Sequence, residues 1–386
     1  MDLSLDCYLG ETDPQGGALC PAALLPLFWA AGDEPPPYFV GGSRMTASPP
    51  PMSPKRRFLA GLFGGRVDRT PVGNPTSVAT VELMETTGAY FPDAHLDAEK
   101  MAALAAGGHD VLGYDTIAPY FSVQQEAEAL GCEVDWGDPE NMPVNTTSPY
   151  ADPEEVVIPA DFLERRSIKT VIEAIRLLRS RYGDHVVIVG KVMGPWTLSY
   201  HLNGIQPFLQ DTLLEPERVR RFLQLLKKVS VTFGRAQVQA GADVLVLADH
   251  ATGDLVSPNC YRDFLLPVHR EITAELGCPT ILHICGNTTD RLEYITQTGF
   301  DAFHFDSKVN TRTALEIVNR RITLVGNVNN PQTLLRGTPE QVKAETRELL
   351  ELGVPIVGPE CAVPLITPNR NLTAIVEAVE EYHAKS

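Results

Sequence analysis

Short apolar runs alternate with longer stretches of helical periodicity through most of this chain. Eight such runs occur, over residues 70–74, 111–117, 186–193, 244–248, 280–285, 302–305, 323–328 and 355–358. They are rich in Val, Ile and Leu and lack a clean apolar–polar alternation, which is typical of strands buried on both faces in a parallel sheet. The stretches between them are amphipathic; in residues 216–238, for example, Val219, Phe222 and Leu226 recur at helical spacing.

This order of elements predicts an α/β domain of the (β/α)8 TIM-barrel type. Eight strand–helix units over about 330 residues fit a closed barrel better than an open doubly wound sheet. No Gly-x-Gly-x-x-Gly follows any run, which removes the usual reason to expect an open, dinucleotide-binding sheet. A first helix is expected after Met52, because Ser53 suits an N-cap and Pro54 suits the first turn.

Two segments depart from the repeating pattern. Residues 1–51 carry two triple-proline runs and no sustained periodicity, so we expect a poorly ordered extension ahead of a barrel domain at residues 52–386. The connection over residues 118–168, after the second predicted strand, is too long for a plain crossover. Loops of that length are usually functional lids or small excursions, and we expect this one to cover the mouth of the barrel.

Composition narrows the range of partners and compartments. Lys and Arg number 32 against 49 Asp and Glu, a formal charge of −17, which argues against nucleic acid and anionic membrane surfaces as partners. No run of about 18 apolar residues exists, so no membrane span is expected. The seven cysteines are scattered and odd in number, unlike a secreted disulfide framework, and indicate a cytoplasmic protein with reduced thiols.

The most informative polar residues close two of the apolar runs. On a strand over residues 280–285, His283 and Cys285 share one face, because side chains alternate with a period of two. Cys361 follows the last run at the start of a loop. A His-x-Cys pair alone is weak evidence, since both residue types are common in cores. All three residues fall at strand carboxyl ends, where barrel enzymes keep their active sites, and this position favours a metal site.

Two thiolates and an imidazole form a donor set that suits zinc, and three protein ligands leave the fourth position open, as in catalytic sites. Such a zinc can hold a substrate thiol as its thiolate at neutral pH, ready to attack an electrophilic carbon. Zinc sites that activate water for hydrolysis usually combine His with carboxylates. Alcohol dehydrogenases also use two Cys and one His, but they need a nicotinamide site, for which we find no motif. The donor set therefore favours alkylation of a thiol.

Other polar residues fall at the same predicted edge of the barrel. Asp306 ends the sixth run, where it could fill the fourth zinc position, orient a ligand, or cap the next helix. Asp249 and His250 follow the fourth run and could act in catalysis, although capping is favoured for Asp249. Glu360 stands beside Cys361, as a supporting or simply exposed residue. Four further residues are expected at the mouth, the first three near a cofactor and the last in catalysis: Asp115, Gly286, Asn287 and Asn327.

Several of these segments resemble the methylcobamide:coenzyme M methyltransferases of the uroporphyrinogen decarboxylase superfamily. The resemblance runs from about Met52 to the C-terminus, and its motifs are Asp-Arg-Thr-Pro-Val at 68–72, Leu-His-Ile-Cys-Gly-Asn at 282–287, Leu-Val-Gly-Asn-Val at 324–328 and Gly-Pro-Glu-Cys at 358–361. It implies a TIM barrel with one zinc on His283, Cys285 and Cys361. It also implies that methylcobalamin, or a related corrinoid on a separate corrinoid-binding protein, supplies a methyl group to a thiol. Asp306 falls where related enzymes place a Glu that can occupy the vacant zinc position.

Two alternatives to a thiol acceptor remain. Related proteins use tetrahydrofolate as the methyl acceptor, and no residue of this chain separates that small molecule from a thiol. The decarboxylase branch carries a Gly-Arg-Tyr motif for substrate carboxylates, where this chain reads Gly88-Ala89-Tyr90. The missing guanidinium removes a bidentate carboxylate partner, which makes a decarboxylase-like lyase the less favoured alternative.

Overall fold

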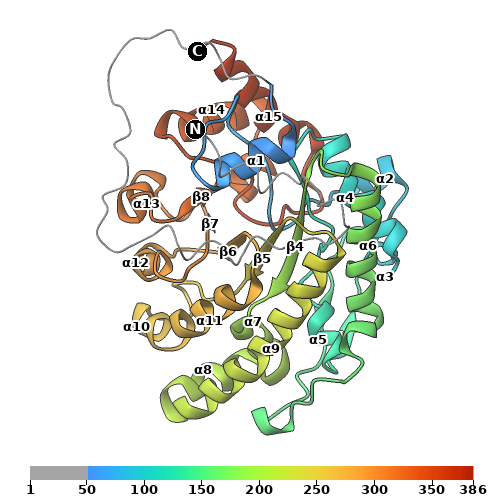
Figure 1. Ribbon diagram of the computed structural model, residues 1–386, viewed down its shortest axis with the longest axis vertical. Coiled ribbons are helices and arrows are strands. Elements are labelled where there is room, and N and C mark those ends of the chain that lie inside the picture. The colour runs from blue at the N-terminus through green and yellow to red at the C-terminus, as the bar shows by residue number, and fades with distance from the viewer. Residues whose placement is uncertain (1–50, 386) are drawn as a thin grey trace, which may run out of the picture.

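Six parallel strands form the central sheet of this computed structural model, which describes residues 51–385. The predicted extension over residues 1–51 lies outside the described residues except for Pro51. The strands neighbour one another in the order β1-β4-β5-β6-β7-β8, with helices outside them (Figure 1). Their bounds are β1 (Thr116–Ile117), β4 (Val187–Met193), β5 (Val244–Ala248), β6 (Thr280–Ile284), β7 (Ala302–Phe305) and β8 (Thr323–Val325).

Two further segments join the edges of this sheet. Ile356 pairs in parallel with Val325 of β8, and Val357 pairs in parallel with Val72. The N–H of Asp115, just before β1, donates to the carbonyl of Val72 at 2.7 Å. The circuit of main-chain hydrogen bonds thus returns to β1 through the first and last predicted runs, and the predicted α/β architecture with a parallel barrel sheet is confirmed.

The helices lie outside the sheet and follow the predicted alternation. The longer ones are α1 (Pro54–Leu62), α2 (Val81–Thr87), α4 (Ala98–Asp110), α6 (Arg166–Tyr182), α7 (Pro195–Asn203), α8 (Ile205–Leu214), α9 (Pro216–Ala240), α11 (Leu266–Leu276), α13 (Thr311–Val318), α14 (Pro339–Leu352) and α15 (Asn369–His383). The short ones are α3 (Asp93–Leu96), α5 (Gln125–Ala129), α10 (Pro258–Cys260) and α12 (Leu292–Ile295). Within residues 51–385, no helix combines the length and the apolar character that crossing a membrane requires.

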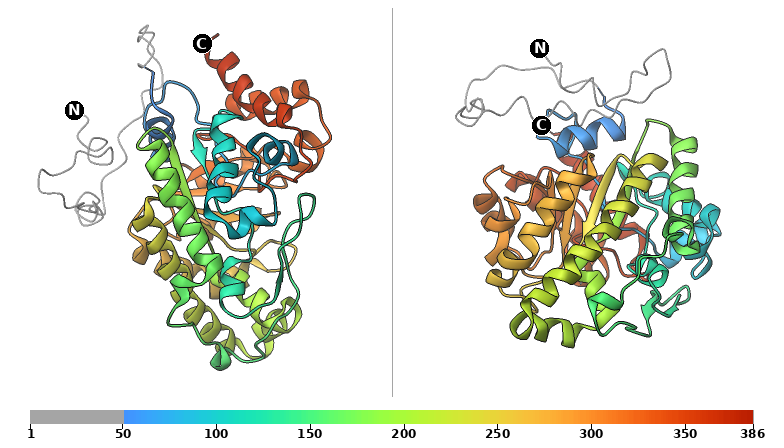
Figure 2. Two further views of the ribbon diagram at one scale, coloured as in Figure 1. Left: turned by 90° about the vertical axis from the view of Figure 1, so that its right-hand side faces the viewer. Right: turned by 60° about the horizontal axis from the view of Figure 1, so that its bottom comes forward.

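The interior of the barrel is apolar at its base. Alternate strand residues point inward, and the lower ones form a buried cluster that includes Val187, Val246 and Ile281. Helix α1 covers this end of the barrel (Figure 2) and adds Phe58 and Leu59 to the same cluster. His283 lies two residues further along β6 than Ile281 of this cluster, nearer the carboxyl end of the strand.

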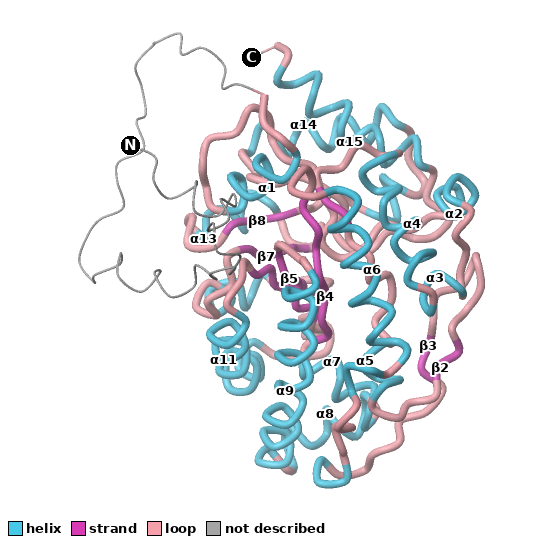
Figure 3. Tube along the Cα trace, turned by 45° about the vertical axis from the view of Figure 1, so that its right-hand side comes forward, coloured by secondary structure: helices cyan, strands magenta, loops and turns pink. Residues whose placement is uncertain are grey.

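Residues 118–168, where an excursion is predicted, contain some regular structure. They include α5 and an antiparallel pair, β2 (Val134–Asp135) with β3 (Val144–Asn145), which lies apart from the barrel strands (Figure 3). Two 3-10 turns follow, at Pro153–Glu155 and Phe162–Glu164, before α6 begins. The N–H of Tyr150 donates to the carbonyl of Leu202 at 2.9 Å and so joins this segment to α7.

Candidate metal centre

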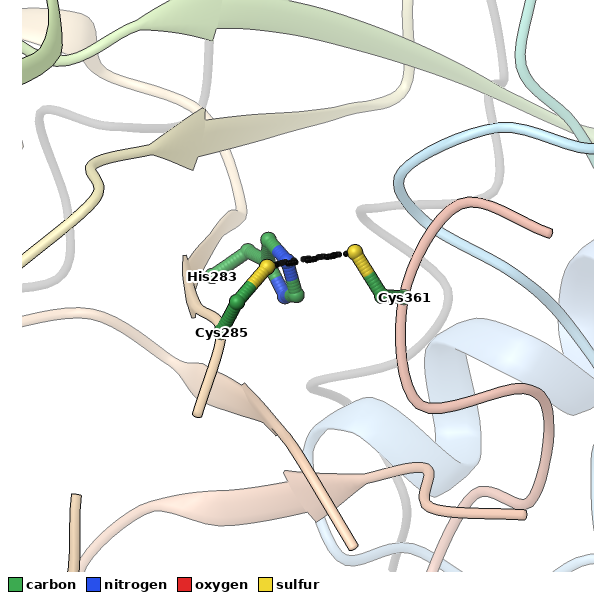
Figure 4. Close-up of side chains that lie close together, drawn as sticks. All are labelled: His283, Cys285 and Cys361. Carbon is green, nitrogen blue, oxygen red and sulfur yellow. Dashed lines mark hydrogen bonds between the residues drawn. The ribbon is translucent and has the colours of Figure 1, made fainter. Parts of the chain in front are cut away.

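Three side chains from two distant parts of the chain converge at the carboxyl end of the barrel. The Nε2 atom of His283 lies 3.0 Å from Sγ of Cys285 and 3.3 Å from Sγ of Cys361, and the two sulfurs are 3.2 Å apart (Figure 4). Within residues 51–385, they form the one group of three or more His, Cys, Asp or Glu side chains close enough to share an ion. The separations allow one ion to contact all three donors at the roughly 2.0–2.3 Å typical of zinc.

His283 is oriented for this role by its neighbours. On β6 it faces inward, two residues beyond Ile281 of the apolar base. Its Nδ1–H donates to the carbonyl of His304 at 3.2 Å, and the two rings lie 4.6 Å apart. His304 in turn donates from Nε2 to the carbonyl of Pro359 at 2.8 Å. A proton on Nδ1 leaves the Nε2 lone pair of His283 directed at the sulfurs, as a metal-binding imidazole requires.

Cys361 lies on a loop, so its position depends on side chains that hold the backbone. Asn74 donates from Nδ2 to the carbonyl of Cys361, and Asn330 donates from Nδ2 to the carbonyl of Ala362, each at 2.9 Å. The carboxylate of Glu360, 5% exposed, accepts the N–H groups of Ser307 and Asn330 at 2.8 Å. Glu360 is thus a buried support of this loop and not an exposed residue.

The two sulfurs influence each other's protonation. The hydrogen bond between them is the largest cause that lowers the pKa of Cys361 well below its usual value, and nearby His283 adds to this effect. The same hydrogen bond, together with burial, raises the pKa of Cys285. The pair therefore favours one thiolate that accepts from the other thiol, and such a pair exchanges its remaining proton readily for a cation.

The three side chains open into a cavity of about 620 Å³. Part of the lining comes from residues 118–168, with Phe121, Met142 and Asn145, and part comes from α7 and the start of α8, with Tyr200, His201 and Ile205. The cavity is large enough for a small substrate beside the three donor atoms. Its remaining lining residues are Thr76, Ser122, Val123, Pro143, Ser148, Lys191, Met193, Thr197, Gly204, Ala248, Asp249, His250 and Ala362.

Lys191 is a site residue that the sequence analysis did not identify. It lies within β4, is 3% exposed and lines the cavity, with its ammonium 4.6 Å from the centre of the Tyr120 ring. Burial lowers its pKa to about 8, while nearby Glu126, Cys361 and Cys285 act in the opposite direction. A lysine inside an otherwise apolar run is a signal that could have revealed it, because a charged side chain is rarely buried without a role.

Asp249 and His250 both line the cavity, but they are held differently. The carboxylate of Asp249 accepts the N–H of Thr197 in the first turn of α7 at 2.7 Å, and His269 Nε2 lies 3.0 Å from its other oxygen. Asp249 therefore caps a helix, as favoured from the sequence, although the helix precedes it in the chain. The pKa of His250 is lowered by burial and by His283, so its imidazole is held neutral.

Four other predicted site residues lie in turns near the three donor atoms but outside the cavity lining. Asp306 is not part of the three-residue cluster; its two oxygens accept the N–H groups of Gly286 at 2.7 Å and Lys308 at 2.8 Å. Asn327 donates from Nδ2 to the carbonyl of Asp306 at 3.3 Å, and Asn287 accepts the N–H of Thr289 within its own turn. In the described part of the chain, none of Asp306, Gly286, Asn287 and Asn327 lines the cavity. They shape the turns around the donor atoms instead.

Asp115 lies at the wrong end of the barrel for the predicted role at the mouth. It precedes β1, where its carboxylate pairs with Arg57 at 2.7 Å and Arg69 at 3.0 Å and accepts the N–H of Val72 at 2.8 Å. The apolar run over residues 111–117 suggested a strand that Asp115 would end, but α4 extends to Asp110 and the strand begins only after Asp115. The prediction that Asp115 binds a cofactor at the mouth is therefore corrected.

Comparisons with known proteins agree with this geometry. The family model of uroporphyrinogen decarboxylase (URO-D) matches residues 53–382. A methylated-thiol–coenzyme M methyltransferase from Methanosarcina mazei is 39% identical over 331 residues, covering 86% of this chain and 90% of the relative. A methylcobamide:CoM methyltransferase from Methanosarcina barkeri is 35% identical over 333 residues, covering 86% of this chain and 98% of the relative. The chain belongs to the uroporphyrinogen decarboxylase family, in its methylcobamide:coenzyme M methyltransferase branch.

A solved structure supports the same placement within the methyltransferase branch. It is a methyltransferase from Methanosarcina mazei, with a TM-score of 0.83 and 36% identity, and the match covers 86% of this chain and 99% of that chain. The resemblance stated from the sequence motifs is thus confirmed, and so is the expectation that the chain is an enzyme of the methyltransferase class.

Proposed function

We propose that residues 52–386 transfer a methyl group from a methylated corrinoid, carried by a separate protein, to a small thiol of the coenzyme M type. The observation that carries this proposal is the convergence of one imidazole and two thiols on one point of a cavity large enough for a small substrate. The relatives named for methyl transfer to coenzyme M, at 39% and 35% identity, support the reaction class.

In this proposal His283, Cys285 and Cys361 hold zinc. The donor set, the orientation of His283 by the carbonyl of His304 and the shared proton of the two thiols all fit that ion. Bound zinc supplies one property, which is to favour the thiolate form of a thiol at neutral pH. The residues themselves keep the donor atoms in place: Asn74 fixes the Cys361 backbone, and β6 and the turn after it fix the other two.

The excursion over residues 118–168 acts as a lid in the proposed reaction. Its residues Phe121, Met142 and Pro143 line the cavity wall, and a wall of that kind excludes water from a reacting thiolate. Met142 and Val144 are 38% and 52% exposed, so the outer part of the lid also offers apolar surface to a docked corrinoid-binding protein. We propose that this protein approaches the mouth on that side.

Tetrahydrofolate is the second candidate acceptor, and a lyase reaction is the third. A pterin amine gains less from a thiophilic metal than a thiol does, so the donor set favours the thiol. The decarboxylase alternative lacks support at Ala89, which is buried in the apolar core and offers no partner to a substrate carboxylate. The scattered and odd-numbered cysteines of the sequence fit the reduced, cytoplasmic setting that we propose.

Metal analysis combined with a spectral assay tests the proposal. The full chain is supplied with methylcobalamin and with coenzyme M or tetrahydrofolate in separate reactions. We expect about one zinc per chain, and cobalamin demethylation only when the thiol is present. Demethylation with tetrahydrofolate alone would change the acceptor but keep the methyltransferase. A protein without zinc that demethylates nothing would contradict the proposed function.

A further inference from the structure

Lys191 places a buried ammonium group in the cavity without an acceptor for its hydrogen bonds. Its backbone N–H and carbonyl are both bonded to the side chain of Gln237. Within residues 51–385, the Nζ atom has no hydrogen bond and no carboxylate oxygen within 4.0 Å, and it lies 4.6 Å from the centre of the Tyr120 ring. A buried cation in this state lacks the compensation that buried charges normally have.

The neighbouring carboxylate of Glu126 does not supply that compensation directly. Its two oxygens are occupied by the hydroxyl of Tyr120 and by the N–H of Met193 at 2.9 Å. These contacts turn Glu126 toward the protein and away from the cavity, whereas Lys191 lines the cavity. The ammonium therefore remains available to a ligand.

No other lining residue in the described part offers a full positive charge to that ligand. Burial lowers the pKa of His201 to about 4 and also lowers the pKa of His250, so both rings are neutral near pH 7. The carboxylate of Asp249, the one acid in the lining, is taken up by Thr197 and His269. The inner surface of the cavity thus combines one free cation with two sulfurs.

We propose that Lys191 binds the negatively charged end of the thiol acceptor and thereby determines the preference for an anionic thiol over a neutral one. This inference rests on the proposed function, since it assigns the far end of the thiol whose sulfur lies at His283, Cys285 and Cys361. Lys191 is accordingly a specificity-determining residue, because a neutral thiol leaves its charge uncompensated.

The test compares Lys191→Met with the wild-type full chain, both loaded with zinc. Isothermal titration calorimetry measures the binding of coenzyme M, of ethanesulfonate, which has the anion without the thiol, and of 2-mercaptoethanol, which has the thiol without the anion. We expect Lys191→Met to lower the preference for coenzyme M over 2-mercaptoethanol by about 10- to 100-fold, the usual worth of a hydrogen bond to a charged group. Lys191→Arg keeps the charge and is expected to retain most of that preference.

Each outcome is decisive for the inference. The inference is overturned if Lys191→Met binds coenzyme M and 2-mercaptoethanol more weakly by the same factor, because Lys191 would then act on the sulfur. It is also overturned if the ratio of the two affinities does not change, because Lys191 would then act on neither end. If Lys191→Met fails to fold, the wild-type chain still decides, since equal affinity for coenzyme M and 2-mercaptoethanol also overturns the assignment. Failure of the proposed function is distinguishable: no thiol would then demethylate methylcobalamin, while ethanesulfonate binding would still depend on Lys191.

Discussion

Cys361 provides the sharpest test of the metal centre at the scale of single residues. Replacing Cys361 with Ala removes one of three donors, and we expect loss of stoichiometric zinc and of methyl transfer while the circular dichroism spectrum stays native. The matched control is Cys260→Ala, a partly buried cysteine outside the cluster, which should retain zinc. Zinc content by atomic emission and demethylation of methylcobalamin are the two readouts. If Cys361→Ala retained both zinc and demethylation activity, the assignment of the ligand set would be wrong.

A substitution at Asp306 tests whether this residue binds zinc directly or only supports a residue that does. Both of its oxygens accept backbone N–H groups, including that of Gly286 next to Cys285. We therefore expect Asp306→Ala to keep one zinc per chain but to bind it about 10- to 100-fold more weakly, as for other groups that orient metal ligands. A competition titration with a chelating dye measures the affinity. Complete loss of zinc would instead show that Asp306 is a primary ligand.

For single residues, the sequence predicted the direction of a side chain correctly where the residue lies on or beside a regular strand. The period of two correctly placed His283 and Cys285 on one face, because β6 is regular up to Ile284. The contribution of Asn74 to the loop of Cys361 could not be predicted, since the contact spans 287 positions along the chain. Lys191 was missed because its role depends on which strand residues turn inward near the mouth.

At the scale of elements, the turn that follows β6 determines where Cys285 points. Gly286 has a φ of +80°, and a Cβ there would meet the Thr252 hydroxyl oxygen at 2.2 Å. Gly88 has a similar φ of +69°, but nothing lies within 4 Å of its Cβ position. We expect Gly88→Ala to show the left-handed strain alone, about 1–2 kcal/mol of unfolding free energy. Gly286→Ala should lose more stability and also bind zinc more weakly, because the turn must shift.

Urea unfolding and zinc titration on these two variants measure the difference. A Gly286→Ala protein that matches Gly88→Ala in both stability and zinc affinity would show that the close approach of Thr252 is unimportant for the site. The pair is informative because both substitutions add the same atom to a left-handed residue, and only the surroundings differ.

The strands themselves were easier to predict from the sequence than their ends. All eight apolar runs contribute main-chain pairing to the barrel, because burial on both faces requires continuous apolar residues. The prediction of a strand over residues 111–117 was wrong in its first part, because β1 begins only at Thr116. An apolar run looks the same in a helix end, a turn or a strand. Closure through isolated bridges at Val72 and Val357 depends on pairing across nearly the whole chain, which local patterns do not encode.

At the scale of the whole molecule, the two ends of the barrel differ in character within the described residues. At the base, α1 fills the interior with apolar side chains, and Arg57 links Asp68 to Asp115 through ion pairs of 2.7 Å. At the mouth, buried polar groups are arranged around three donor atoms and a cavity. This is the usual division of a TIM barrel, in which the amino-terminal face maintains the fold and the carboxyl-terminal face carries the reaction.

Asp115 tests this division, because it was expected at the mouth and lies at the base. Replacing Asp115 with Asn removes the carboxylate that pairs with both Arg57 and Arg69, although Arg57 keeps its pair with Asp68. Removing one partner of a buried ion pair typically costs about 3–5 kcal/mol of unfolding free energy, and we expect a loss at the lower end of that range. The control Asp110→Asn removes a partner of Arg181 at a site where both side chains are exposed, and should change stability by no more than about 1 kcal/mol. Zinc affinity should be unchanged in both variants, since neither residue lies near the donor atoms. Weaker zinc binding in Asp115→Asn, measured at a temperature where the protein is fully folded, would mean that the base and the mouth are coupled.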